Sequence, residues 1–240
     1  MSLRTPEKIQ ALQRKLYLKA KQEPSYRFYA LYDKVCRPDI LAYAYALAKS
    51  NGGAAGVDCV RFEDIQSYGI ERFLAELRQE LREKRYQPEA VLRVMIPKPN
   101  GGERPLGIPT IRDRVVQAAV KLVLEPIFEA DFTEEAYGYR PRRSAQHAVR
   151  AVHQALKAGF VHVVDADLSK YFDTIPHSEL MRSVSRRVSD GAVLHLVKRW
   201  LKAPIEETSD KGKPTRRRTG NRGTPQGGVL TPQTMLPKTG

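Results

Sequence analysis

Apolar side chains recur at helical spacing along much of this chain. In the first 50 residues the pattern predicts two basic helical segments, 6–20 and 25–48, with an interruption near Pro38. A glycine-rich break at residues 51–58 follows. Beyond it, one amphipathic helix is predicted over residues 62–85, with an apolar stripe formed by Ile70, Phe73, Leu74, Leu77 and Leu81.

The second half of the chain carries further helical stripes. One predicted helix ends before Pro126, and its stripe is Val115, Val116, Ala119, Val120, Val123 and Leu124. Ser144 is a candidate N-cap for a helix that runs to about residue 157. Two more helices are expected, one at about 177–188 and a second whose apolar face is Val193, Leu194, Val197, Trp200 and Leu201.

Three stretches read as strands or turns. Two short strands around Asn100-Gly101-Gly102 predict a hairpin. Residues 160–167 are short and β-branched, which predicts a buried strand. Residues 208–228 are rich in glycine, threonine and arginine and predict a loop or an edge hairpin. Helices mixed with these strands indicate an α+β fold.

Charge is the strongest bulk signal. The chain has 41 Lys and Arg against 27 Asp and Glu, a formal net charge of +14. Such a surplus favours a polyanionic partner, most often nucleic acid, over a protein that is merely basic. Cys36 and Cys59 stand at no metal-ligand spacing and are interpreted as free thiols in a reducing compartment. Because no apolar run is long enough to span a bilayer, we expect a cytoplasmic protein with no membrane partner.

Two carboxylates end the predicted 160–167 strand. Asp165 and Asp167 are two residues apart, so on a strand they would share a face. Carboxylates on a buried strand are costly unless they bind a cation, which makes a metal site one interpretation. The alternative is an ordinary strand-to-helix connection with acidic caps.

Two other motifs are candidates for phosphate and nucleotide contacts. Lys98 and Arg104 flank the predicted hairpin turn, where a point charge and a forked guanidinium could grip a triphosphate. A solvated basic hairpin tip is an equal alternative. The motif RGTPQGGVLTP, residues 222–232, combines glycines that permit close backbone approach with the amide of Gln226.

The order of these motifs is more specific than any one of them. The blocks IPKPNGGERPLGIPTIRDRVVQ, AYGYRPRRSAQHAV, VVDADLSKYFD and RGTPQGGVLTP resemble the reverse transcriptases of group II introns. The ending QGGVLTP matches that family's QGxxxSP pattern, with Thr231 in place of serine. The break NGGAAGVDCV resembles the family's extra N-terminal block, which usually reads GxDG and here has Cys59 in place of the last glycine.

The resemblance implies a right-hand polymerase in four parts: a helical basic N-terminal extension (1–50), fingers (51–155), a partial palm (156–232) and an unpatterned tail (233–240). It also implies RNA-directed DNA synthesis, with intron RNA or template, DNA primer and dNTP as partners. Carboxylates are the ligands that Mg²⁺ prefers, and the resemblance makes Mg²⁺ the expected cofactor.

The resemblance assigns roles residue by residue. Asp167 would be a catalytic, metal-binding carboxylate, with Asp165 and Asp173 in supporting roles. Lys98 and Arg104 would grip the dNTP triphosphate. Nucleotide contacts would also come from Phe172, which would exclude a ribose 2′-hydroxyl, and from Gln226. The basic residues beside the template path would be Arg216, Arg217, Arg218 and Arg222.

One departure from the family bears on activity. The family carries a YxDD box after these motifs, and no such box occurs in the 240 residues. The only later aspartates are Asp190 and Asp210, and neither stands next to another aspartate. We therefore expect a reverse transcriptase sequence truncated before its active site is complete, inactive as a polymerase on its own. The alternative is a stand-alone RNA-binding module.

Overall fold

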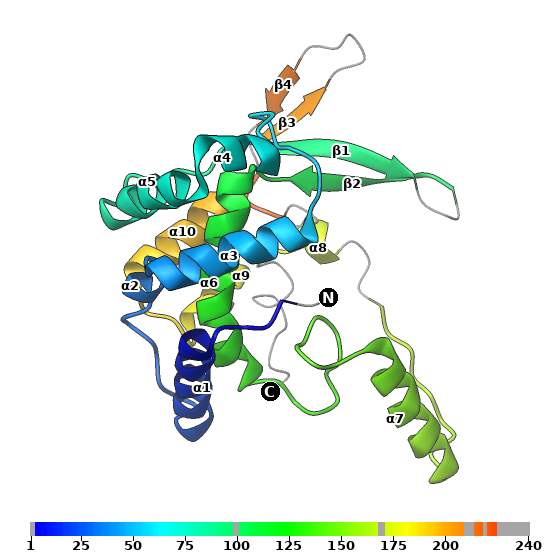
Figure 1. Ribbon diagram of the computed structural model, residues 1–240. Helices are drawn as coiled ribbons and strands as arrows, with labels where there is room; N and C mark the ends of the chain where they lie inside the picture. The colour runs from blue at the N-terminus through cyan, green and yellow to red at the C-terminus, as the bar shows by residue number, and fades with distance from the viewer. Residues whose placement is uncertain (1–2, 98–100, 168–170, 209–213, 218–219, 225–240) are drawn as a thin grey trace.

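The chain folds into a helical body that carries one four-stranded sheet (Figure 1). A computed structural model describes residues 3–97, 101–167, 171–208, 214–217 and 220–224. The helices are α1 (Glu7–Gln22), α2 (Tyr32–Val35), α3 (Pro38–Asn51), α4 (Phe62–Tyr68), α5 (Ile70–Arg82), α6 (Ile111–Glu129), α7 (Ala145–Lys157), α8 (Tyr171–Thr174), α9 (His177–Ser185) and α10 (Gly191–Leu201). The strands are β1 (Val91–Pro97), β2 (Glu103–Ile108), β3 (Ile205–Thr208) and β4 (Pro214–Arg217).

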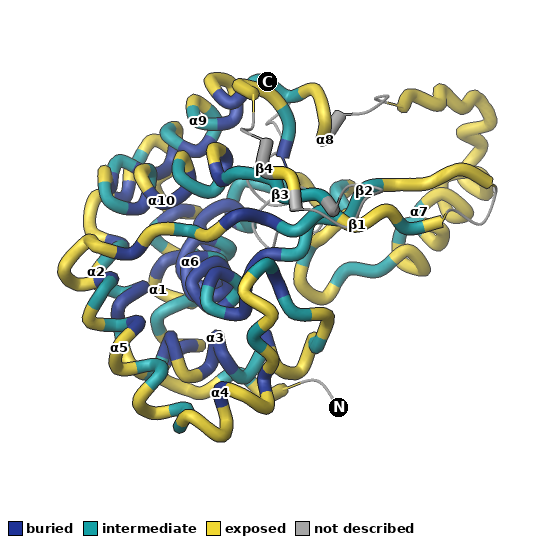
Figure 2. The backbone as a smooth tube through the Cα atoms, turned by 90° about the horizontal axis from the view of Figure 1, so that it is seen from above, coloured by how far each residue is buried: buried dark blue, intermediate teal, exposed yellow. Residues whose placement is uncertain are grey.

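Helix α6 is the centre of the core. Fourteen of its 19 residues are buried, and α1 and α3 pack directly against it (Figure 2). Such extensive burial is typical of a helix surrounded by neighbours. At its start Thr110 accepts a hydrogen bond from the backbone of Asp113, as an N-cap does. The core therefore forms around the stripe that the sequence predicts.

Helix α6 continues through Pro126, so the predicted end before this proline was wrong. Proline has no N–H to donate to the carbonyl of Leu122 in the preceding turn. The side-chain amide of Gln13 on α1 donates to that carbonyl oxygen at 3.0 Å instead. A neighbouring helix thus supplies the hydrogen bond that the proline cannot make.

The other helix predictions are confirmed with changes in their bounds. Pro38 is the first residue of α3. The residues between Ser25 and Leu31 were predicted to be helical, and this was wrong. The single helix predicted over 62–85 is broken into α4 and α5 at Gly69, whose φ of 105° is one that other residues rarely adopt. Ser144 caps α7 as predicted, through a hydrogen bond accepted from His147.

The sheet has the strand order β2-β1-β3-β4. The predicted hairpin is confirmed: β1 and β2 are antiparallel, with Ile96 opposite Arg104. β3 joins the other side of β1 in parallel, and β4 pairs antiparallel with β3 at the edge. The edge hairpin predicted within residues 208–228 is therefore present, and it begins at Ile205. An ion pair between Arg93 and Glu207, at 2.8 Å, ties β1 to β3.

Residues 160–167 do not form the buried strand that their composition predicts. No strand is assigned there, and the side chains of Phe160 and Val164 are 71% and 94% exposed. A strand needs a neighbouring strand to pair its backbone groups and to cover one face. The described sheet is built from β1, β2, β3 and β4, and both views place α7 and the segment after it away from the helical body (Figures 1 and 2).

The glycine-rich break is held against the start of α6. A Cβ at Gly56 would lie 2.8 Å from the backbone of Thr110, so only glycine fits there. Arg114 donates to the carbonyl oxygens of Pro109, Gly52 and Ala54. Cys59, which stands where the resemblance expects glycine, has a φ of 57° in the left-handed region.

Replacing Cys59 by glycine is expected to stabilise the protein. The left-handed conformation destabilises the folded state by about 1–2 kcal/mol for a non-glycine residue. Glycine also gives the unfolded chain more conformational entropy, which offsets about 0.4–1 kcal/mol of the gain. The free energy of unfolding should therefore rise by about 0.5–1 kcal/mol, measured by urea titration. Cys59→Ala is the control, because it removes the exposed thiol but keeps the Cβ. An equal gain in both variants would assign the effect to the thiol instead.

Within the described ranges, no helix combines the length and the apolar character that a membrane span requires.

Candidate nucleic-acid interface

The hairpin of β1 and β2 carries the first group of candidate residues. Arg104 lies on β2 with its side chain exposed, and Gly101 and Gly102 have φ angles of 84° and 79° that permit the tight turn. Lys98 lies outside the described residues. The structure thus places one of the two predicted triphosphate cations on an exposed strand next to the turn.

A buried polar network fixes the base of this hairpin. The hydroxyl of Tyr86 donates to Asp113 at 2.5 Å, the indole N–H of Trp200 donates to the same hydroxyl at 3.1 Å, and the backbone of Glu89 donates to Asp113 at 3.0 Å. Burial is the main cause that raises the pKa of both Tyr86 and Asp113 above their ordinary values. The network joins the residues before β1 to α6 and α10, so the hairpin projects from a rigid base.

The second group follows the 160–167 stretch. Asp165 and Asp167 are both exposed, and the backbone of Tyr171–Thr174 forms the short helix α8, which includes Phe172. The shared strand face expected for the two aspartates is absent because no strand forms. No strand pairing therefore holds the two carboxylates on one face.

The third motif lies directly against the second. Gly223 N–H donates to the carbonyl of Ile175 at 2.9 Å, and a Cβ at Gly223 would lie 2.7 Å from the carbonyl oxygen of Asp173. Gly223 also has a φ of 79°. The glycine is therefore required twice, by its backbone angle and by its close approach. Gln226 of the same motif lies outside the described residues.

Folding thus brings together two motifs that are far apart in the sequence. Arg222 is exposed beside this contact, and its backbone forms a bridge with Pro176. Of the other basic residues, Arg216 and Arg217 lie on the edge strand β4, with Arg216 in register with Glu206. Arg218 lies outside the described residues.

Asp190 is fully used by the fold. Its carboxylate accepts from the backbone N–H groups of Leu31 and Tyr32 at 2.7 and 2.8 Å, and from those of Ala192 and Val193 at 3.0 and 3.2 Å. One side chain therefore caps α10 and anchors the start of α2. A structural carboxylate with four donors is not available for a metal ion.

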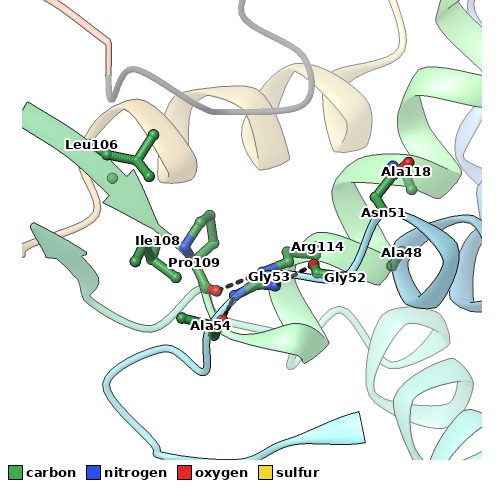
Figure 3. A pocket seen from close by; sticks show the side chains of 11 residues that line it. Ala48, Asn51, Gly52, Gly53, Ala54, Leu106, Ile108, Pro109, Arg114 and Ala118 are labelled. Atoms are coloured by element: carbon green, nitrogen blue, oxygen red, sulfur yellow. Dashed lines mark hydrogen bonds between the residues drawn. The ribbon is translucent and has the colours of Figure 1, made fainter. Parts of the chain in front are cut away.

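A pocket of about 350 Å³ opens between the glycine-rich break, the end of β2 and α6 (Figure 3). Leu106, Ile108 and Ala118 supply apolar walls, and Arg114 points its guanidinium at the break. Burial lowers the pKa of Arg114 below its ordinary value. Sequence reasoning did not single out Arg114 or Asp113. The signal was present, since both are charged residues just before the apolar stripe of this helix.

The described residues do not form a complete metal site. Within the part of the chain that the structure describes, no three His, Cys, Asp or Glu side chains gather where they could hold a metal ion. Asp167 supplies one exposed carboxylate. Asp165 and Asp173 are also exposed.

The sequence of this chain matches a known protein family and several known proteins. Residues 96–236 match the family described as reverse transcriptase (RNA-dependent DNA polymerase). Protein YkfC of Escherichia coli K12 is 41% identical over 231 residues, which are 93% of this chain and 58% of that protein. The group II intron-encoded protein LtrA of Lactococcus lactis subsp. cremoris is 34% identical over 206 residues, which are 85% of this chain and 33% of LtrA.

A solved structure titled a partial Cas6-RT-Cas1–Cas2 complex shares the fold. Its matching chain has a TM-score of 0.51 and 24% identity over 85% of this chain and 33% of its own length. The chain thus spans 58% of YkfC and 33% of LtrA. With more than half of its residues matched to one family and with intron-encoded relatives, the chain belongs to the reverse transcriptases (RNA-dependent DNA polymerases) of the group II intron type.

Proposed function

We propose that this chain is the RNA-binding and nucleotide-positioning part of an RNA-directed DNA polymerase that also serves intron maturation. The observation that carries the proposal is the contact between residues 221–224 and residues 173–177. It places the start of the glycine-rich motif beside the segment that follows Asp167. The maturation role is supported by the names of relatives, which include a group II intron-encoded protein and a nuclear intron maturase.

The proposed architecture has three working parts. Residues 1–50 are the N-terminal extension, 51–155 the fingers and 156–232 a partial palm. The rigid base under the β1–β2 hairpin supports the finger assignment, because a hairpin that grips a triphosphate must keep a fixed position. The proposed partners are intron or template RNA, a DNA primer and dNTP.

The proposed site residues keep the roles that the resemblance implies. Asp167 would be the metal-binding carboxylate, and Mg²⁺ would supply charge stabilisation at the transferred phosphate when bound. Lys98 and Arg104 would hold the triphosphate, Phe172 would sense the sugar, and Gln226 would lie near the nucleotide. The exposed side chain of Arg104 agrees with its proposed role.

The cations near β4 would contact the template. Arg216, Arg217, Arg218 and Arg222 are proposed for this role, and the exposure of Arg222 supports it. Arg222 is therefore the residue of this group from which we expect the clearest phosphate contact.

The 240 residues alone are expected to bind structured RNA without synthesising DNA. The net charge of +14 drives binding, and no adjacent pair of aspartates occurs after Asp173. With about five to eight phosphates neutralised, log affinity should fall with log salt at a slope of roughly −4 to −7. The measurement is titration of a labelled intron-domain RNA at several salt concentrations, with primer extension in parallel.

A matched pair of variants sharpens this test. Arg222→Gln should make the salt slope less steep by about 1, because one phosphate contact is lost. Arg72→Gln also removes one positive charge, but Arg72 is already paired with Glu76 at 3.1 Å, so the slope should stay the same. Salt-independent or undetectable binding by a folded sample would overturn the RNA role, and robust extension would show that the 240 residues polymerise on their own.

A further inference from the structure

The contact between the two motifs includes the side chain of His177. Its backbone N–H donates to the carbonyl of Asn221 at 2.9 Å, and its ring nitrogen Nε2 lies 2.7 Å from the carbonyl oxygen of Gly223. A carbonyl oxygen only accepts, so Nε2 carries the hydrogen of this bond. His177 therefore donates twice to a segment that lies more than 40 residues further along the chain.

The surroundings make these bonds expensive to lose. His177 is 8% exposed and Thr224, next to Gly223, is 7% exposed, so the imidazole side of the contact is shielded from water. A buried carbonyl that loses its donor keeps its desolvation cost without compensation. His177 is the first residue of α9 and follows the N-cap Pro176, whose backbone is extended. The imidazole is thus mounted on a helix whose Leu180 and Val184 are part of the core.

The two segments are also joined through their backbones. Gly223 N–H donates to the carbonyl of Ile175 at 2.9 Å, and together with the bond from His177 N–H to Asn221 this forms the bridge of Pro176 with Arg222. The ring of His177 adds a side-chain hydrogen bond to this short backbone pairing.

We propose that His177 is a positioning residue that seats residues 221–224 against residues 173–177. Gln226 follows this segment by two residues in the sequence and lies outside the described residues. The role of Gln226 rests on the proposed function, whereas the seating itself is tested without RNA, nucleotide or metal.

Two substitutions separate the N–H donor from the ring. His177→Phe keeps a flat buried ring of similar size but has no donor, whereas His177→Gln keeps an N–H group near the place of Nε2. His195→Phe is the matched control, because His195 is exposed on α10. The samples are the 240-residue chain and these three variants, without ligand.

The readout is amide hydrogen exchange at Gly223, with core amides of α6 as an internal reference. In His177→Phe the exchange rate at Gly223 should rise at least about tenfold while the α6 amides keep their protection. The His177→Gln variant should stay within about threefold of the native rate, and His195→Phe should match it. Nitrogen chemical shifts of the native ring should show the hydrogen on Nε2.

Each opposite result overturns the proposal. Unchanged protection of Gly223 in His177→Phe would show that the imidazole does not seat the segment. Equal losses at Gly223 and in α6, or equal losses in the Phe and Gln variants, would make His177 a general packing residue. If the nitrogen chemical shifts place the hydrogen of the native ring on Nδ1, the ring cannot donate from Nε2 to Gly223. This measurement requires no variant.

Discussion

Replacing Asp167 by alanine is expected to abolish DNA synthesis in a chimera that joins residues 1–232 to the palm and thumb of a group II intron reverse transcriptase. Asp167 is the proposed metal ligand, and its carboxylate is exposed. The grafted palm would supply the other carboxylates that bind the same metal ions. Loss of a metal ligand removes charge stabilisation that is worth several kcal/mol, so extension should drop by at least about a thousandfold. Primer extension with Mg²⁺ and dNTPs measures this.

Asp165→Ala is the matched control for this experiment. The two aspartates are two residues apart and both are exposed, so each substitution removes the same charge from the same stretch of chain. The Asp165 variant should keep measurable extension, and both variants should bind RNA as the parent chimera does, since the basic surface is unchanged. Near-normal extension by the Asp167 variant would refute the catalytic assignment.

Replacing Gly223 by alanine is expected to dislodge the glycine-rich motif. The added Cβ would lie 2.7 Å from the carbonyl oxygen of Asp173, and the φ of 79° would be strained for any other residue. The backbone angle costs about 1–2 kcal/mol, and the overlap costs about 1–3 kcal/mol more. In the chimera, extension should therefore fall by about tenfold or more, since about 1.4 kcal/mol corresponds to a factor of ten.

Gly220→Ala provides the control, because a Cβ at Gly220 meets no atom within 4 Å. Both changes add one methyl group to the same segment, three residues apart. Extension rates and urea midpoints of the two variants are compared with those of the parent. Equal behaviour of the two variants would show that the contact of Gly223 with Asp173 does not support the site.

Local patterns predicted most of the helices and the hairpin because their signals lie within a few residues of each other. Ser144 caps α7, and Gly101 and Gly102 take the angles that a tight turn requires. The predictions that failed depended on distant partners. Pro126 stays inside α6 because Gln13 replaces the missing donor, and residues 160–167 lack a neighbouring strand among the described residues.

The sequence by itself determined the family and the types of residues at the candidate site. Motif order and spacing survive in the linear chain, so the resemblance to group II intron reverse transcriptases needs no coordinates. It could not show which motifs touch, because contacts across tens of residues depend on how the helices pack around α6. Only the tertiary structure showed that Gly223 lies against the backbone of Asp173 and that the carboxylate of Asp190 accepts from four backbone N–H groups. The physical reason is that a glycine or a carboxylate has the same local signature whether it serves a ligand or the fold, and its partners decide which.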